Sequence, residues 1–111
     1  DYEISNLSEL EVDSRYVIFS AIANPTNFLK ILKKNNFKVE KEYIFPDHYI
    51  YRESDLTNIL NYAKNKNLKV MTTEKDYSKI DNKYLNEISF LKLDLKILNE
   101  KKFINFLKQE K

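Results

Sequence analysis

The sequence predicts an α/β domain in which helices flank a mainly parallel sheet. Apolar runs of strand length alternate along the chain with stretches of helical periodicity, which is the pattern of successive β-α-β units. The length of 111 residues suits one domain that buries a real core, but it is too short for two. Short segments with polar residues follow three of the apolar runs, at residues 21–25, 45–48 and 72–76, and the carboxyl ends of parallel strands meet at one edge of a sheet. We therefore expect the order β-α-β-α-β-(α)-β-α, with the polar segments gathered at one edge.

The first strand of this sheet is expected at residues 15–21, an apolar run typical of burial on both faces. The preceding residues 1–14 are polar and acidic, so we interpret them as a linker with a short strand near residues 2–7. The carboxyl-terminal α/β domain is then expected to span residues 15–111. A chain that begins with Asp1 instead of Met suggests a fragment of a longer protein.

A helix and a second strand follow the first strand. Asn24-Pro25 starts the helix, because Asn caps a first turn well and Pro tolerates the first helical position. Asn35-Asn36 is expected to end it. Residues 37–45 begin in alternation, as in a half-exposed strand, and Pro46 stops that strand.

A second helix is expected from about Glu53 to Lys66, capped by Ser54 or its neighbour. It presents one buried stripe at helical spacing, formed by Leu56, Ile59, Leu60 and Ala63. Residues 68–72 then read as a short apolar strand.

The last part of the chain is less regular. After Asp76 we expect a stretch with one helical turn that reaches Ile88. Alternation over residues 91–97 predicts a strand with one wet face, and Asn99 is expected to cap a last helix.

Composition excludes several kinds of site. With no glycine, the chain holds neither a Walker-type phosphate loop nor a dinucleotide fingerprint, and Asn is expected to take left-handed turn positions, as in Asn35-Asn36 and Asn65-Lys66-Asn67. With no cysteine, it forms no disulfide and no thiolate metal site, which fits a reducing compartment. The net charge of +2 is small and does not indicate a nucleic-acid partner. Nucleic-acid binding is an alternative that rests on lysine content alone. No apolar run approaches the roughly 20 residues of a membrane span, and no signal peptide is visible.

The segment Asp47-His48 follows the second strand and holds the only histidine. A histidine at the carboxyl end of a strand can act as a general acid or base, or tune a carboxylate supplied from elsewhere. The alternative is a plain turn, because Pro-Asp is common turn chemistry.

The segment Thr72-Thr73-Glu74-Lys75-Asp76 follows the third strand. Its hydroxyls and ammonium suit phosphate or sugar, and its carboxylates suit ribose hydroxyls or a metal. The alternative is a helix start, with Thr73 as the cap and Asp76 at the third helical position.

In this order, the three segments resemble the carboxyl-terminal part of the tetraacyldisaccharide 4′-kinases, the lipid A 4′-kinases of Gram-negative bacteria. That family shows Phe-x-Gly-Ile-Gly-Asn-Pro, then Phe-Pro-Asp-His-His, then Thr-Thr-Glu-Lys-Asp followed by a basic residue. The corresponding segments here are residues 19–25, 45–49 and 72–79, and the likeness covers roughly residues 15–98.

The resemblance implies a fragment of a P-loop-type kinase that transfers the γ-phosphate of ATP to the 4′-hydroxyl of a lipid-linked tetraacyldisaccharide 1-phosphate. It implies that ATP and Mg²⁺ are bound mainly by an amino-terminal P-loop domain of the same polypeptide, so that the fragment is inactive alone. It also implies a cytoplasmic protein, peripheral to the cytoplasmic face of the inner membrane.

The same resemblance implies roles for individual residues. His48 would partner an aspartate of the amino-terminal domain and accept or steer the proton of the attacking hydroxyl, with Asp47 orienting it. Possible contacts with nucleotide or substrate would come from residues facing the cleft between the domains, which are Asn24, Thr72, Thr73, Glu74, Lys75 and Asp76. No residue of this chain is expected to bind the metal.

Four residues depart from the family pattern. Ala21 and Ala23 stand where the family has glycine, at a cost of about 1–2 kcal/mol if either needs a positive φ. Tyr49 replaces the second histidine, and Lys79 replaces an arginine, which loses bidentate geometry. These departures keep open a second hypothesis, a non-catalytic binding or docking α/β module in which the motif residues are structural.

Overall fold

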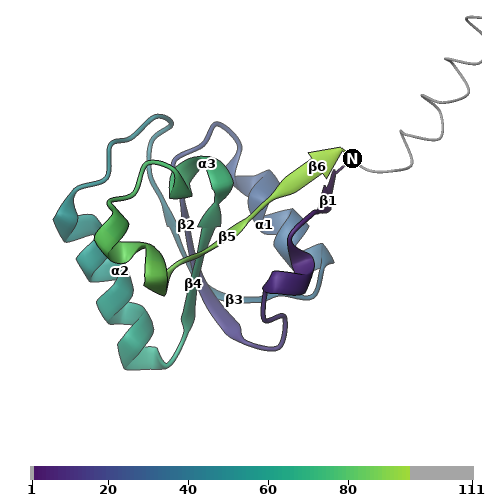
Figure 1. Cartoon of the computed structure of the whole chain (residues 1–111), viewed down its shortest axis with the longest axis horizontal. Helices are drawn as coiled ribbons and strands as arrows, with labels where there is room; N and C mark the ends of the chain where they lie inside the picture. The colour runs from purple at the N-terminus through teal and green to yellow at the C-terminus, as the bar shows by residue number, and fades with distance from the viewer. Residues whose placement is uncertain (1, 96–111) are drawn as a thin grey trace, which may run out of the picture.

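The computed structural model of the chain describes residues 2–95 (Figure 1). In chain order its elements are β1 (Tyr2–Ile4), the 3₁₀ helix η1 (Leu7–Glu9), β2 (Arg15–Ser20), α1 (Pro25–Lys34), β3 (Lys38–Ile44), α2 (Glu53–Lys66), β4 (Lys69–Thr73), α3 (Glu74–Tyr77), the 3₁₀ helix η2 (Asn82–Glu87), β5 (Ser89–Leu91) and β6 (Leu93–Leu95). A four-stranded sheet has the order β3-β2-β4-β5, and a two-stranded sheet pairs β1 with β6.

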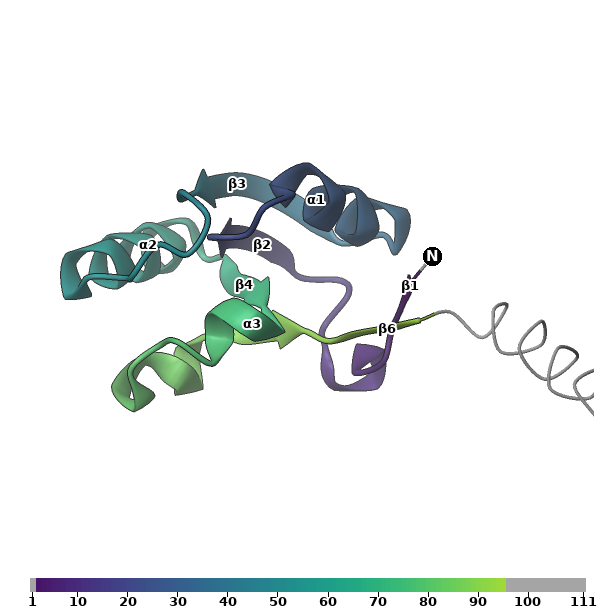
Figure 2. The same ribbon diagram turned by 90° about the horizontal axis from the view of Figure 1, so that it is seen from above.

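All strand pairs of the larger sheet are parallel, as the sequence predicts. The central strand β2 is buried on both faces, and its side chains alternate between two clusters. Val17 and Phe19 pack with residues of α2, whereas Tyr16 and Ile18 pack with residues of α1. Figure 2 shows the result, with α1 and α2 on opposite faces of the sheet. The predicted α/β architecture is therefore confirmed.

The first long helix starts and ends as its sequence predicts. The side-chain oxygen of Asn24 accepts a hydrogen bond from the backbone N–H of Asn27 at 3.1 Å, and Pro25 is the first helical residue. The helix ends at Lys34, after which Asn36 adopts a φ of 68°. Asn replaces the usual glycine at this left-handed position because its short polar side chain tolerates it best.

The second long helix has the predicted bounds but a different start. Ser54 makes no cap; instead, the Asp55 carboxylate accepts a hydrogen bond from the backbone N–H of Arg52 at 2.8 Å. Asp55 also places negative charge in the first turn, where the helix dipole favours it. At the other end Asn67 takes a φ of 58°, so Asn again supplies the left-handed turn.

The predicted strand at residues 91–97 is wrong in one respect, because the chain leaves the parallel sheet at Lys92. β5 ends the parallel sheet, and β6 pairs antiparallel with β1. The break is held by the buried amide of Asn6, which donates to the carbonyl of Phe90 at 2.8 Å and accepts from the N–H of Lys92 at 3.0 Å.

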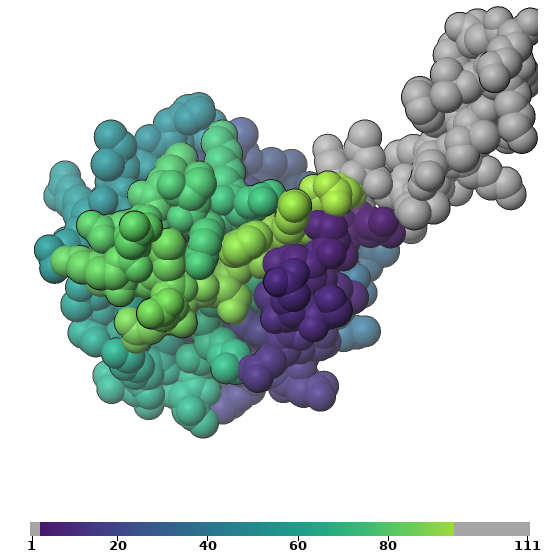
Figure 3. Space-filling model, viewed as in Figure 1, coloured from purple at the N-terminus to yellow at the C-terminus, as the bar shows by residue number. Residues whose placement is uncertain are grey.

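The leading residues therefore pack on the domain. Ile4, Leu10 and Val12 contact the cluster on the α1 side. The early strand is limited to β1, shorter than the expected residues 2–7. In the space-filling view the purple leading segment lies beside the yellow-green β6 (Figure 3). Residues 96 and 97 of the expected strand and the helix expected from Asn99 lie outside the described residues.

Candidate functional site

The three polar segments meet at the carboxyl ends of β2, β3 and β4. The backbone N–H of His48 donates to the carbonyl of Ala21 at 3.3 Å, and the hydroxyl of Thr72 donates to the carbonyl of Phe19 at 2.7 Å. The chain passes from β2 to β3 on one side and later to β4 on the other, so this edge contains the point where the strand order reverses. Open α/β sheets place ligands at such a point. We call this edge, formed by residues 20–24, 45–51 and 72–76, the carboxyl rim.

Asp76 joins all three segments of the carboxyl rim. Its side chain is fully buried, and its two oxygens accept from the N–H of Ala21 at 3.1 and 3.2 Å. One oxygen also accepts from the hydroxyl of Tyr51 at 3.0 Å, and the other from the hydroxyl of Thr73 at 2.7 Å. The Thr73 hydroxyl in turn accepts from the N–H of Asp76 at 3.0 Å, which confirms Thr73 as the cap of α3.

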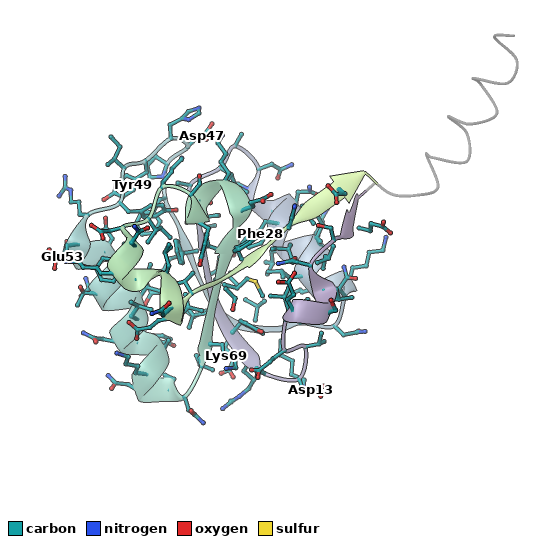
Figure 4. All side chains as sticks on the ribbon, in the orientation of Figure 1. Asp13, Phe28, Asp47, Tyr49, Glu53 and Lys69 are labelled. Carbon is teal, nitrogen blue, oxygen red and sulfur yellow. The ribbon has the colours of Figure 1, made fainter. Side chains whose placement is uncertain are left out.

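His48 lies on the outside of the carboxyl rim. Its side chain is 74% exposed, and Nε2 lies 3.6 Å from Oδ2 of Asp47, an ion-pair distance when the imidazole is protonated but too long for a hydrogen bond. Its backbone φ is 65°, in the left-handed region. Histidine tolerates that region better than most residues do, and such backbones gather at functional sites. Figure 4 shows Asp47 at the tip of the loop that leads to α2.

A cluster of aromatic rings from residues 19, 45, 49 and 51 supports this loop. The ring of Tyr49 stacks on Phe45 with centroids 4.9 Å apart, and the ring of Tyr51 meets Phe19 and Phe45 edge to face at 5.3 and 5.2 Å. The hydroxyl of Tyr49 donates to Asp55 at 2.7 Å. Tyr49, which stands at the family's second histidine, therefore serves the fold.

Sequence reasoning missed Tyr51 as a residue of the site. Its hydroxyl reaches Asp76 across 25 positions of sequence, and no local pattern reports such a contact. Burial, followed by the negative charge of Asp76, raises the pKa of the Tyr51 phenol, so the hydroxyl remains protonated and donates at neutral pH.

The remaining candidate residues divide into buried and exposed groups. Thr72, like Asp76, is fully buried, and its hydroxyl is used within the fold. Asn24, Glu74 and Lys75 are exposed, although the Asn24 side chain also caps α1. The structure therefore brings all three segments together but presents only part of their chemistry to solvent.

The departures from the family motif are accommodated. Neither Ala21 nor Ala23 is among the positive-φ residues of the described chain, so alanine costs no backbone strain at either position.

Lys79 lines a cavity of about 350 Å³ together with Tyr51 and Lys83. On its wall, the Glu53 carboxylate lies 3.0 Å from the Lys83 ammonium, which holds the pKa of Glu53 below its usual range.

The described residues offer neither a cluster of metal ligands nor a membrane-spanning helix. Between residues 2 and 95, no group of three or more His, Asp or Glu side chains is placed to hold a metal ion. Within the same part of the chain, no helix has the length and apolar character needed to cross a bilayer.

Comparison with known proteins gives a consistent result. The sequence model of the family described as tetraacyldisaccharide-1-P 4′-kinase matches residues 2–111. A curated tetraacyldisaccharide 4′-kinase of Pelagibacter ubique is 39% identical over 102 residues, which cover 92% of this chain and 32% of that protein. The corresponding protein of Rickettsia bellii is 41% identical over 73 residues, 66% of this chain and 23% of its own length.

A third relative with the same name, from Bartonella quintana, is 36% identical over 72 residues, 65% of this chain and 21% of its own length. The chain thus spans about a third or less of the curated relatives that it matches. No solved structure gives a significant match.

Proposed function

Because the chain belongs to the tetraacyldisaccharide-1-P 4′-kinase family, we propose that it is the carboxyl-terminal part of a lipid A 4′-kinase. The complete enzyme would transfer the γ-phosphate of ATP to the 4′-hydroxyl of a tetraacyldisaccharide 1-phosphate. Two observations support this proposal. The three motifs occur in the family's order, and their segments meet at the carboxyl rim.

His48 is the group of this chain that we propose to act in the reaction. The observation that carries this assignment is the exposed imidazole of His48 on the carboxyl rim, held beside the carboxylate of Asp47 by a left-handed turn. An exposed imidazole can accept or steer the proton of an attacking hydroxyl, and it can reach a carboxylate of a second domain. Asp47, whose Oδ2 lies 3.6 Å from Nε2 of His48, is the neighbouring group that we propose to orient the imidazole.

The remaining chemistry would come from outside this chain. Without glycine the chain contains no Walker-type phosphate loop, and between residues 2 and 95 no group of three or more His, Asp or Glu side chains is placed to hold Mg²⁺. ATP and Mg²⁺ would therefore bind mainly to an amino-terminal P-loop domain of the same polypeptide. The 111 residues alone are expected to be inactive, and the complete protein is expected to act at the cytoplasmic face of the inner membrane on its lipid disaccharide.

Two substitutions at His48 in the complete polypeptide test the proposal. His48→Asn keeps a side chain that tolerates the left-handed backbone but has no titratable nitrogen, whereas His48→Ala also disturbs the turn. We expect both to lower kcat for phosphotransfer about 10²-fold or more, as loss of an acid–base group does. An unchanged kcat in His48→Asn, with the protein folded, would remove His48 from the mechanism.

A non-catalytic docking module is the second candidate. The observation in its favour is that Thr72, Thr73 and Asp76 use their polar atoms within the fold. The gene sequence preceding Asp1 separates the candidates. A Gly-x-x-x-x-Gly-Lys-Thr/Ser loop followed by acidic residues supports the kinase, whereas an unrelated domain or an immediate start codon supports the module.

A further inference from the structure

We propose that Asp76 is a positioning residue that holds His48 in place for phosphotransfer. The inference deepens the proposed function and rests on it. It concerns a buried side chain that touches neither the imidazole nor any reacting group, and it assigns this side chain a role through the backbone of the His48 turn.

The turn that carries His48 is fastened to Asp76 on both sides. On one side the His48 N–H donates to the carbonyl of Ala21, and the N–H of the same Ala21 donates to Asp76. On the other side Tyr51, three residues after His48, donates its hydroxyl to Asp76. The two attachments are therefore at the backbone of His48 itself and at Tyr51, three residues later.

The second attachment is stiff. The Tyr51 ring is fixed by edge-to-face contacts with Phe19 and Phe45, which leave its hydroxyl directed at the carboxylate. A raised pKa keeps that hydroxyl protonated, so it remains a donor. Displacement of the carboxylate would therefore move both ends of the His48 turn together.

Capping of α3 does not account for this arrangement. A capping residue needs only contacts within its own first turn, which Thr73 provides. Asp76 additionally receives donors from Ala21 and Tyr51, which are 55 and 25 positions away in the sequence. Burial of a carboxylate is costly unless hydrogen bonds replace its water, and here the replacing donors come from the segments that set the His48 turn.

The test compares two tyrosine variants of the complete polypeptide. Tyr51→Phe removes one hydroxyl that bonds to Asp76 and keeps the ring. Tyr16→Phe is the matched control, because its hydroxyl donates to the carbonyl of Glu11 at 2.7 Å, at the opposite end of β2. We expect Tyr51→Phe to lower kcat about 10-fold, since small misplacements of a reacting group cost one to two orders of magnitude, and Tyr16→Phe to leave kcat unchanged.

Asp76→Asn is tested in two backgrounds. In the unsubstituted protein it should lower kcat about 10-fold or more, with little change in KM for ATP. In the His48→Asn background it should lower kcat no further, because a positioning residue acts only through the group it positions. Equal losses in both backgrounds, or equal effects of the two tyrosine variants, would overturn the inference.

Hydrogen exchange of the 111-residue chain provides a readout that does not depend on activity. In Tyr51→Phe and Asp76→Asn, exchange of the Ala21 and His48 amides should accelerate about tenfold or more, while Tyr16→Phe leaves both rates unchanged. Unaltered exchange in Asp76→Asn would overturn the inference. Absence of 4′-kinase activity in the unsubstituted complete protein would instead overturn the proposed function.

Discussion

The left-handed backbone at His48 leads to a measurable prediction about stability. At a φ of 65°, alanine is disfavoured by about 1–2 kcal/mol, whereas glycine adopts this conformation freely. Glycine gives back about 0.5–1 kcal/mol through its larger unfolded-state entropy. His48→Gly should therefore be more stable than His48→Ala by about 0.5–1 kcal/mol. Loss of the imidazole cancels in this comparison, because both variants lack it.

Lys30 provides the matched control. It is an exposed residue in the middle of α1, where the backbone is right-handed and glycine is about 1 kcal/mol less favourable than alanine. The preference between glycine and alanine should thus reverse between the two positions, with a combined difference of about 1.5–2 kcal/mol. A difference of this size is well resolved by urea unfolding of the 111-residue chain.

The sign of the effect at His48 decides the outcome. If alanine is preferred over glycine at His48 by the same margin as at Lys30, then His48 has no left-handed backbone in solution. The turn described here, and the exposed position of the imidazole that depends on it, would then be wrong.

Three further outcomes follow from the structure. Ile59→Ala should lower the free energy of unfolding by about 2–5 kcal/mol, measured by urea denaturation. Ile59 belongs to α2 and is 1% exposed, in the apolar cluster between this helix and the sheet. The pKa of Glu53, followed by NMR, should lie below its usual range and should rise toward that range in Lys83→Met. Because the pKa is depressed in the folded state, the Glu53 carboxylate stabilises the fold at neutral pH. That contribution is lost as the pH falls through the folded-state pKa. The pKa of Tyr51 is raised in the folded state, so the free energy of unfolding should fall as pH rises above about 10, and it should fall less steeply in Tyr51→Phe.

Local sequence patterns were sufficient for the elements whose causes are local. Asn24-Pro25 starts α1 through bonds within one turn, and Thr73 caps α3 in the same way. The parallel sheet followed from helices placed between apolar runs, because such connections leave successive strands running in the same direction. The meeting of the three polar segments followed from that topology alone.

Long-range contacts account for what the sequence did not reveal. The alternation of leucines from Leu91 to Leu95 runs unbroken through Lys92, yet the chain changes sheets there because the Asn6 amide holds its backbone. Asp76 was placed at the third position of a helix, which is local, but its bonds to Ala21 and Tyr51 are not. The candidate site was thus predicted as a set of residues, and its internal support was not.

The hydrogen bonds of Asn6 with Phe90 and Lys92 have a consequence for the order in which the domain folds. These two hydrogen bonds join residues 84 and 86 positions apart, whereas the pairing of β2 with β3 and β4 joins closer residues, such as Arg15 with Lys38 and Tyr16 with Lys69. Long loops close late because closure costs more entropy as the loop grows. During synthesis, β2 to β4 can therefore assemble with both long helices before Asn6 contacts Phe90 and Lys92, and these two long-range hydrogen bonds form last.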